Sequence, residues 1–130
     1  MSYNEQIARY FSAAMAAGLT HNEADAIRRD AERIDTWNER ECDGTIILVE
    51  DGEEYENLKP GAYWVRNIDG PGAIRYTRRP DTYTPARARI DAIAAAHGLT
   101  VSHNSDPRGW PVRFATADGR EFSPPVRSYK

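Results

Sequence analysis

The side chains with the most potential for chemistry are three histidines and one cysteine, and their spacing matches no known type of site. The histidines are His21, His97 and His103, and the single cysteine is Cys42. A zinc site needs ligands at short, recognisable spacings such as a Cys-x-x-Cys pair, which this sequence lacks. The sequence therefore predicts no metal and no cofactor, and it indicates a protein that is not an enzyme.

His103 begins a polar segment whose composition suggests an active-site loop. The run Asp106-Pro107-Arg108-Gly109 nonetheless matches a type I turn, with Asp, Pro and Gly at their favoured positions. His103 then has two roles open to it: it bonds the Asp106 carboxylate or a backbone carbonyl, or it contacts a ligand. Because Arg108 has no duty in the turn, we expect a hairpin that displays His103, Arg108 and Trp110 to a partner.

Arginines interleaved with aromatic residues form the strongest constellation in the chain. Such a surface binds nucleic acid through phosphate contacts and base stacking, and the same residue types anchor protein interfaces. Strand alternation is expected to place Trp64, Arg66 and Arg75 on one exposed face of a sheet whose other face is core. Alternatively, some of these arginines pair with the acidic helices. The constellation consists of Trp64, Arg66, Arg75, Tyr76, Arg78, Arg79, Tyr83, Arg87 and Arg89.

The candidate partner-binding set combines this constellation with the hairpin. Its members are Trp64, Arg66, Arg75, Arg78, Arg79, His103, Arg108 and Trp110.

A run of carboxylates occupies residues 50–56, near the middle of the chain. It lacks the ligand spacing of a calcium-binding loop, so no calcium site is predicted. It is either a solvated charge run or a surface that mimics the phosphates of nucleic acid. In the second case Glu53, Glu54 and Glu56 form an alternative partner-binding surface.

Two helices are expected at the N-terminus, over residues 4–17 and 20–42, joined as an antiparallel hairpin. Their apolar residues recur at helical spacing, and Thr20 with Glu23 forms a capping box at the start of the second helix. A third helix is expected over residues 85–97, with Thr84 as its cap. Strands are expected over residues 45–50, 62–67, 73–77, 100–104, 112–116 and 120–123, because these segments are β-branched or alternate in polarity.

These elements predict an α+β fold with a helical hairpin (4–44) followed by one antiparallel sheet of four to six strands. A single helix (85–97) packs against that sheet, which spans residues 45–123. Residues 124–130 are expected as a tail, since two consecutive prolines end regular structure. The length of 130 residues is typical of one domain covering 1–130.

The net charge of −3 hides an asymmetry between the two halves of the chain. Residues 1–65 contain 6 basic and 14 acidic residues, whereas residues 66–130 contain 11 basic and 6 acidic residues. The acidic half repels nucleic acid and the basic half attracts phosphate or an acidic partner, unless both are ordinary solvated surface. No apolar run approaches the ~20 residues of a membrane helix. A single cysteine and an N-terminus without a secretion signal favour a reducing cytoplasm.

Three segments resemble a family of small proteins encoded by bacteriophages and prophages. They are the helix end Trp37-Asn38-Glu39-Arg40-Glu41-Cys42-Asp43-Gly44, then Ala62-Tyr63-Trp64 with the arginines after it, and residues 97–109 from His-Gly-Leu to Asp-Pro-Arg-Gly. Together they span residues 24–114. The chain departs from the family pattern at Ser105, where another polar residue is expected, and at Trp110, where a cysteine is expected.

The resemblance implies a context and no catalytic residue. It implies a phage accessory protein that acts in a bacterial cytoplasm by binding and blocking a host or defence-system protein, as anti-CRISPR inhibitors do. The alternative is a small nucleic-acid-binding module that uses the arginine-rich sheet face. A membrane is not expected as a partner, and the protein is expected to be a monomer or a weak homodimer.

Overall fold

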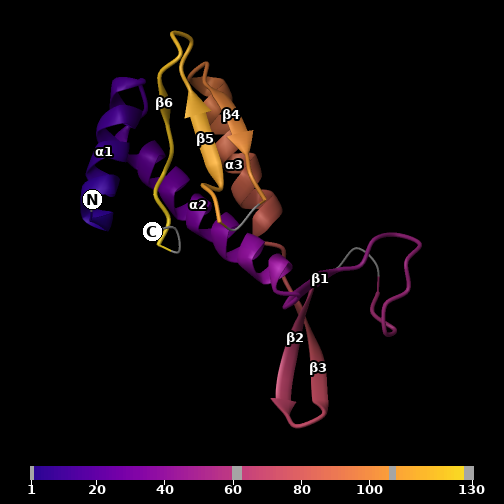
Figure 1. Ribbon diagram of the computed structural model, residues 1–130. Helices are drawn as coiled ribbons and strands as arrows, with labels where there is room; N and C mark the ends of the chain where they lie inside the picture. Colours follow the sequence, from indigo (N-terminus) through magenta and orange to yellow (C-terminus); the bar gives the residue numbers. More distant parts are fainter. Residues whose placement is uncertain (1, 60–62, 106–107, 128–130) are drawn as a thin grey trace.

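The computed structural model describes residues 2–59, 63–105 and 108–127, which form three helices and six strands among them (Figure 1). Two helices come first, and the third helix separates the first three strands from the last three. The elements are α1 (Tyr3–Ala16), α2 (His21–Cys42), β1 (Ile46–Leu48), β2 (Tyr63–Gly70), β3 (Ala73–Arg79), α3 (Tyr83–Ala96), β4 (Thr100–His103), β5 (Val112–Ala115) and β6 (Glu121–Phe122).

The predicted α+β class is confirmed, but the single sheet of four to six strands is wrong. The strands form two separate antiparallel sheets, with the orders β1-β2-β3 and β4-β5-β6. All three helices are part of the packed structure, rather than one helix packed on a sheet beside a separate hairpin. Each sheet forms from strands that are neighbours in sequence, and α3 lies between the two sets of strands.

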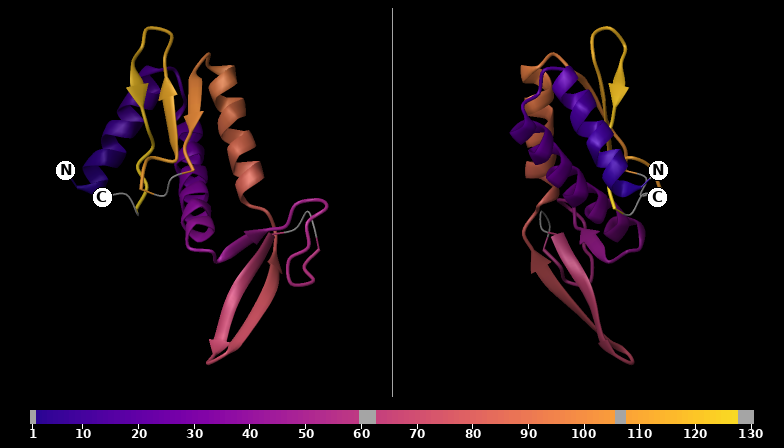
Figure 2. Two further views of the ribbon diagram at one scale, coloured as in Figure 1. Left: turned by 45° about the vertical axis from the view of Figure 1, so that its right-hand side comes forward. Right: turned by 90° about the vertical axis from the view of Figure 1, so that its left-hand side faces the viewer.

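The body of the protein is a layer of three helices covered by the second sheet (Figure 2). Along β5, Val112 and Phe114 are fully buried while Arg113 between them is exposed, so one face of this sheet packs on the helices. The core against it includes Tyr10 of α1, Ile27 of α2 and Ile90 of α3. Among the described residues, this core cluster has no member from β1, β2 or β3.

The helix boundaries follow local signals in the sequence, with one correction. The capping box is confirmed: the Glu23 amide donates to the Thr20 hydroxyl over 3.1 Å, and the Thr20 amide donates to the Glu23 carboxylate over 3.0 Å. Thr84, however, does not cap α3, which begins at Tyr83. The Asp81 carboxylate accepts hydrogen bonds from both the Tyr83 and the Thr84 amides at 2.9 Å, because a carboxylate outcompetes a hydroxyl as acceptor at a helix start.

The segment expected as a tail packs into the body at its start. Pro124, Pro125 and Val126 are buried, and the Arg127 amide donates to the Glu32 carboxylate over 2.9 Å. Prolines end a strand, but their rings are apolar and rigid, so they fill the core at little cost in entropy. The chain therefore adds an irregular layer over α2 after β6.

A buried ion pair joins α2 to α3. Asp30 is 2% exposed, and Arg89 donates to both of its carboxylate oxygens, over 2.9 and 2.8 Å. Arg33 donates to the same carboxylate over 2.6 Å. Because β2 and β3 are inserted between α2 and α3, this pair holds together the two helices from which the insertion leaves.

The insertion projects from the body as a two-stranded arm, formed by β2 and β3 (Figure 1). β1 pairs with the body end of β2, from Ile46↔Val65 to Leu48↔Tyr63. Among the described residues, no helix has both the length and the apolar character needed to cross a membrane.

Candidate functional site

The register of the arm decides which side chains share a face. The directly opposed pairs Trp64↔Arg78, Arg66↔Tyr76 and Ile68↔Ile74 lie on one face, which we call the Trp64 face. The pairs Tyr63↔Arg79, Val65↔Thr77 and Asn67↔Arg75 lie on the other, the Tyr63 face. Arginines therefore occur on both faces of the ribbon.

The predicted grouping of Trp64, Arg66 and Arg75 on one face is wrong. Arg75 stands opposite Asn67, on the Tyr63 face, while Trp64 and Arg66 share the other face. Alternation fixes which residues of one strand share a face, but the register between two strands is set at the turn, where a bulge lies between Ile68 and Gly70.

Neither face of the arm is core, which also corrects the prediction. Most of β3 is exposed, and only Tyr76 and Thr77 are half-buried. At the far end, the side chains of Ile68 and Ile74 face each other across the strands and are 73% and 49% exposed. Large exposed apolar side chains at the end of a projecting element are typical of a contact surface.

The arginines of the arm are presented to solvent. Arg66, Arg75, Arg78 and Arg79 are all exposed. Within the part of the chain that the structure describes, no carboxylate forms an ion pair with Arg66, Arg78 or Arg79. The sequence left open that some arginines of the constellation pair with the acidic helices. Arg89 of α3 does so, because it pairs with Asp30 of α2.

The acidic segment after β1 lies against the Trp64 face. The ring of Tyr55 meets the ring of Tyr76 edge-on, with 6.3 Å between centroids, and the Trp64 indole donates to the Lys59 carbonyl over 3.4 Å. Tyr76 also hydrogen-bonds Glu56, which raises the pKa of Tyr76 to about 12. The acidic alternative surface, Glu53, Glu54 and Glu56, is thus the neighbour of the arm rather than a separate face of the molecule.

Aromatic rings fix the arm to the body. Trp37 of α2 is 6% exposed, and its ring meets that of Tyr63 edge-on, with 4.3 Å between centroids. Tyr83, at the start of α3, stacks on the other side of this joint, 6.2 Å from Trp37. Aromatic pairs of this kind contribute ~1 kcal/mol each beyond the area they bury, so they restrict the angle of the arm.

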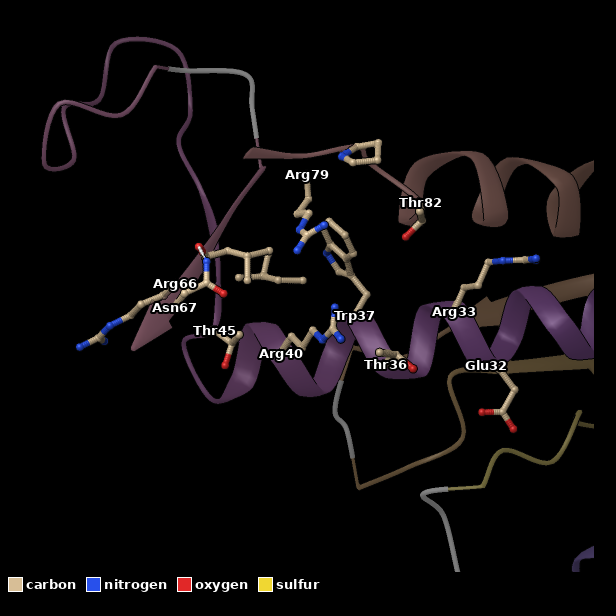
Figure 3. Close-up of a pocket in the computed structure, with 13 residues that line it drawn as sticks. Glu32, Arg33, Thr36, Trp37, Arg40, Thr45, Arg66, Asn67, Arg79 and Thr82 are labelled. Atoms are coloured by element: carbon tan, nitrogen blue, oxygen red, sulfur yellow. Dashed lines mark hydrogen bonds between the residues drawn. The ribbon is translucent and has the colours of Figure 1, made fainter. Parts of the chain in front are cut away.

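A groove of about 820 Å³ opens at this joint, between the C-terminal half of α2 and the body end of the arm (Figure 3). We call it the foot groove. Its lining is rich in arginines and in threonines, and it includes a single carboxylate. The lining residues are Glu32, Arg33, Thr36, Trp37, Arg40, Thr45, Ile46, Val65, Arg66, Asn67, Arg79, Pro80 and Thr82.

Sequence patterns alone missed the contribution of α2 to this groove. Trp37 and Arg33 were not among the predicted partner-binding residues. Arg40 was noted only within the segment 37–44 that carries the family resemblance. That segment was the one available signal, since its residues lie at the helix end from which the chain turns toward the arm.

The hairpin of β4 and β5 is on the body and not on the arm, and the Asn38 side chain near the C-terminal end of α2 donates to the Asn104 carbonyl over 2.9 Å (Figure 1). His103 contacts Asp91 of α3, with 2.7 Å between Nε2 and Oδ1. The predicted turn itself falls on Asp106 and Pro107, which lie outside the described residues. Arg108 is exposed and Trp110 is half-buried, and both belong to the segment between β4 and β5.

His97 has a structural environment at the end of α3. Its Nε2 lies 3.0 and 2.9 Å from the two carboxylate oxygens of Glu23, which joins the end of α3 to the start of α2. The Thr20 amide first, and His97 second, lower the pKa of Glu23. Throughout residues 2–59, 63–105 and 108–127, no group of three or more His, Cys, Asp or Glu side chains is placed to hold a metal ion.

No family model, curated protein or solved structure matches this chain.

Proposed function

We propose that this protein is a non-catalytic binding protein that contacts its partner with the β2–β3 arm. The observation that carries the proposal is the exposure of Ile68 and Ile74, opposed at the end of a ribbon with no core on either face. An isolated two-stranded hairpin is marginally stable in water, so such an arm adds little to the fold of the body. Apolar and arginine side chains that lie away from the core instead suit recognition of a partner.

The partner that best fits this arm is a protein with an apolar pocket and an acidic rim. The two isoleucines would enter the pocket, and Arg66 and Arg78 on the Trp64 face would meet the rim. Arginine and large apolar side chains are common anchors of protein interfaces. The resemblance to phage proteins supplies the setting: a host or defence-system protein in a bacterial cytoplasm, blocked as anti-CRISPR inhibitors block their targets.

The proposal is tested by capture from bacterial lysate with variants of the arm. The double variant Ile68→Ser, Ile74→Ser removes the apolar end, and Met15→Ser is its control because Met15 is 52% exposed on α1. Wild type and the Met15 variant should retain one stoichiometric protein, and the arm variant should lose it. Equal capture by the arm variant would rule out the arm as the contact element.

The same capture decides whether the acidic surface is the contact instead. Reversing Glu53, Glu54 and Glu56 to Lys changes the charge beside the Trp64 face without touching the two isoleucines. If the complex survives loss of the isoleucines and is weakened by these reversals, the partner binds the acidic segment as a mimic of nucleic acid.

A second candidate function, nucleic-acid binding, is favoured by the arginines on both faces of the ribbon. A two-stranded ribbon fits the major groove of duplex DNA, where phosphates flank it on both sides. Reversing Arg75, Arg78 and Arg79 to Glu should then abolish binding to DNA or RNA, and wild-type affinity should fall steeply with salt. An affinity that is independent of salt, or unchanged by the reversals, would dismiss this candidate.

A further inference from the structure

Two arginines from distant parts of the chain converge in the foot groove. Arg40 comes from the last turns of α2 and Arg79 from the end of β3, and both side chains extend toward the space beside Trp37 (Figure 3). Each is exposed, and Trp37 forms an apolar wall between them. Neither position depends on the end of the arm, which lies at the opposite extremity of β2 and β3.

The positive charge of these two side chains is not balanced inside the groove. Glu32 contributes the single carboxylate of the lining, but its oxygen accepts from the Tyr3 hydroxyl over 3.0 Å and from the Arg127 amide over 2.9 Å. Its side chain accordingly points away from the groove (Figure 3). Like charges held on one side of a groove create a local potential that attracts an anion. A carboxylate outside the lining, Asp43, also interacts with Arg40: hydrogen bonds from Thr45 first, and the charge of Arg40 after them, lower the pKa of Asp43.

The other two arginines of the lining have different duties. Arg33 donates to the buried Asp30 carboxylate over 2.6 Å, and the side chain of Arg66 points out of the groove toward the Trp64 face (Figure 3). Arg40 and Arg79 are therefore the guanidinium groups left to act in the groove. The lining also includes three threonines, Thr36, Thr45 and Thr82, of which Thr45 hydrogen-bonds the Asp43 carboxylate through its side chain.

We infer that the foot groove is a phosphate-binding site in which Arg40 and Arg79 hold one phosphate group. A carboxylate carries one charge, which one bidentate arginine balances. Two guanidinium groups suit a tetrahedral phosphate, which has more acceptor oxygens and up to two charges. The volume of about 820 Å³ is that of a small-molecule site, and it leaves room for a nucleoside attached to the phosphate.

The phosphate has two sources, a free nucleotide or the backbone of a nucleic-acid strand, and the probes separate them. Inorganic phosphate, AMP and a short single-stranded oligonucleotide are titrated into the intact protein, with backbone amide NMR shifts as the measurement. Each should shift the amides of residues 36–45 and 79–82. Tighter binding of AMP than of phosphate identifies a nucleotide site, whereas tighter binding of the oligonucleotide with a steep salt dependence identifies a strand site.

The variants Arg40→Gln and Arg79→Gln test the two side chains. Each should weaken binding of inorganic phosphate about ten-fold, because a charge-assisted hydrogen bond contributes on that scale. Arg9→Gln is the matched control, since it removes the same charge from an exposed position on α1 and should bind phosphate as wild type does. Urea unfolding of all three variants confirms that the fold is retained.

The inference is overturned if phosphate leaves these amides unshifted, or if the Gln variants bind as tightly as Arg9→Gln. It is also overturned if acetate displaces phosphate at equal concentration, since the groove would then prefer carboxylates. These outcomes are independent of the capture experiment at Ile68 and Ile74, so either proposal can fail while the other stands.

Discussion

Replacing the buried Asp30 by Asn should destabilise the protein, because it removes the charge that joins α2 to α3. The side chain keeps its volume, so no cavity contributes to the change. The carboxylate accepts three hydrogen bonds, two from Arg89 and one from Arg33. In asparagine an NH₂ group replaces one of these acceptor oxygens. This group would face the arginine N–H donors and could not accept a hydrogen bond from them.

The size of the effect follows from the burial of each partner. Breaking a fully buried ion pair costs about 3–5 kcal/mol, most of it from the charge left behind without a partner. Here the charge that is removed is the buried one, at 2% exposure. The side chains left behind, Arg33 and Arg89, are 48% and 53% exposed and regain water. We therefore expect a loss of about 2–3 kcal/mol in the free energy of unfolding, below the upper range for buried pairs.

The assay is urea unfolding followed by circular dichroism, with thermal unfolding as a second measurement. A loss of this size lowers the melting temperature of a domain of this length by about 10 °C. The control is Asp118→Asn in the β5–β6 turn, where the pair with Arg120 is 64% and 61% exposed and no measurable change is expected. If Asp30→Asn is no more destabilising than Asp118→Asn, the buried pair does not stabilise the helix pair and the argument fails.

Three further predictions concern single contacts. Thr20→Ala should cost about 1 kcal/mol through loss of the capping box, while Thr20→Ser should match wild type in urea unfolding; equal losses would contradict a hydroxyl cap. The depressed pKa of Glu23 stabilises the fold above the ordinary value of 4.5, and this contribution is lost as pH falls through the folded value. In Glu23→Gln the free energy of unfolding should therefore fall less steeply as pH is lowered than it does in wild type. An unchanged dependence on pH would contradict a stabilising role of the Glu23 carboxylate. The protonated hydroxyl of Tyr76 bonds Glu56, and this contact contributes fully to stability at pH values below the ordinary tyrosine pKa of 10.0. The contribution is lost as pH rises through the folded pKa of about 12. Glu56→Gln should lower the pKa of Tyr76, measured by ultraviolet titration with Tyr76→Phe as the reference that identifies the Tyr76 signal. An unaltered pKa would exclude the Glu56 hydrogen bond as the cause of the raised value.

The elements themselves were predictable from the sequence because their signals are local. The capping box at Thr20 and Glu23 lies within one helical turn, and the prediction of a helix start there is confirmed. Apolar spacing likewise located α1, α2 and α3 to within a few residues. The arginine-rich strands were recognised as a candidate contact surface for the same reason: composition and alternation are visible over a few residues.

The grouping of side chains into sites was not predictable in the same way. Arg75 was expected beside Trp64, but one residue of register places it on the opposite face. His103 was expected to bond within its own hairpin, yet its partner is Asp91 of α3. In both cases the deciding contact is between segments whose relative position depends on a turn or on packing, and composition carries no signal for it.

The sequence by itself determined the α+β class, most helix and strand positions, the charge asymmetry of the two halves and the arginine-rich arm as a region of interest. Tertiary structure alone decided that the strands form two sheets, that the arm projects with both faces exposed, and that Arg40 and Arg79 line one groove beside Trp37. The physical reason is the range of the interactions. Helix caps and strand alternation act within a few residues, whereas the foot groove exists only because the core of the body holds α2 and α3 together and fixes where the chain between them leaves and returns.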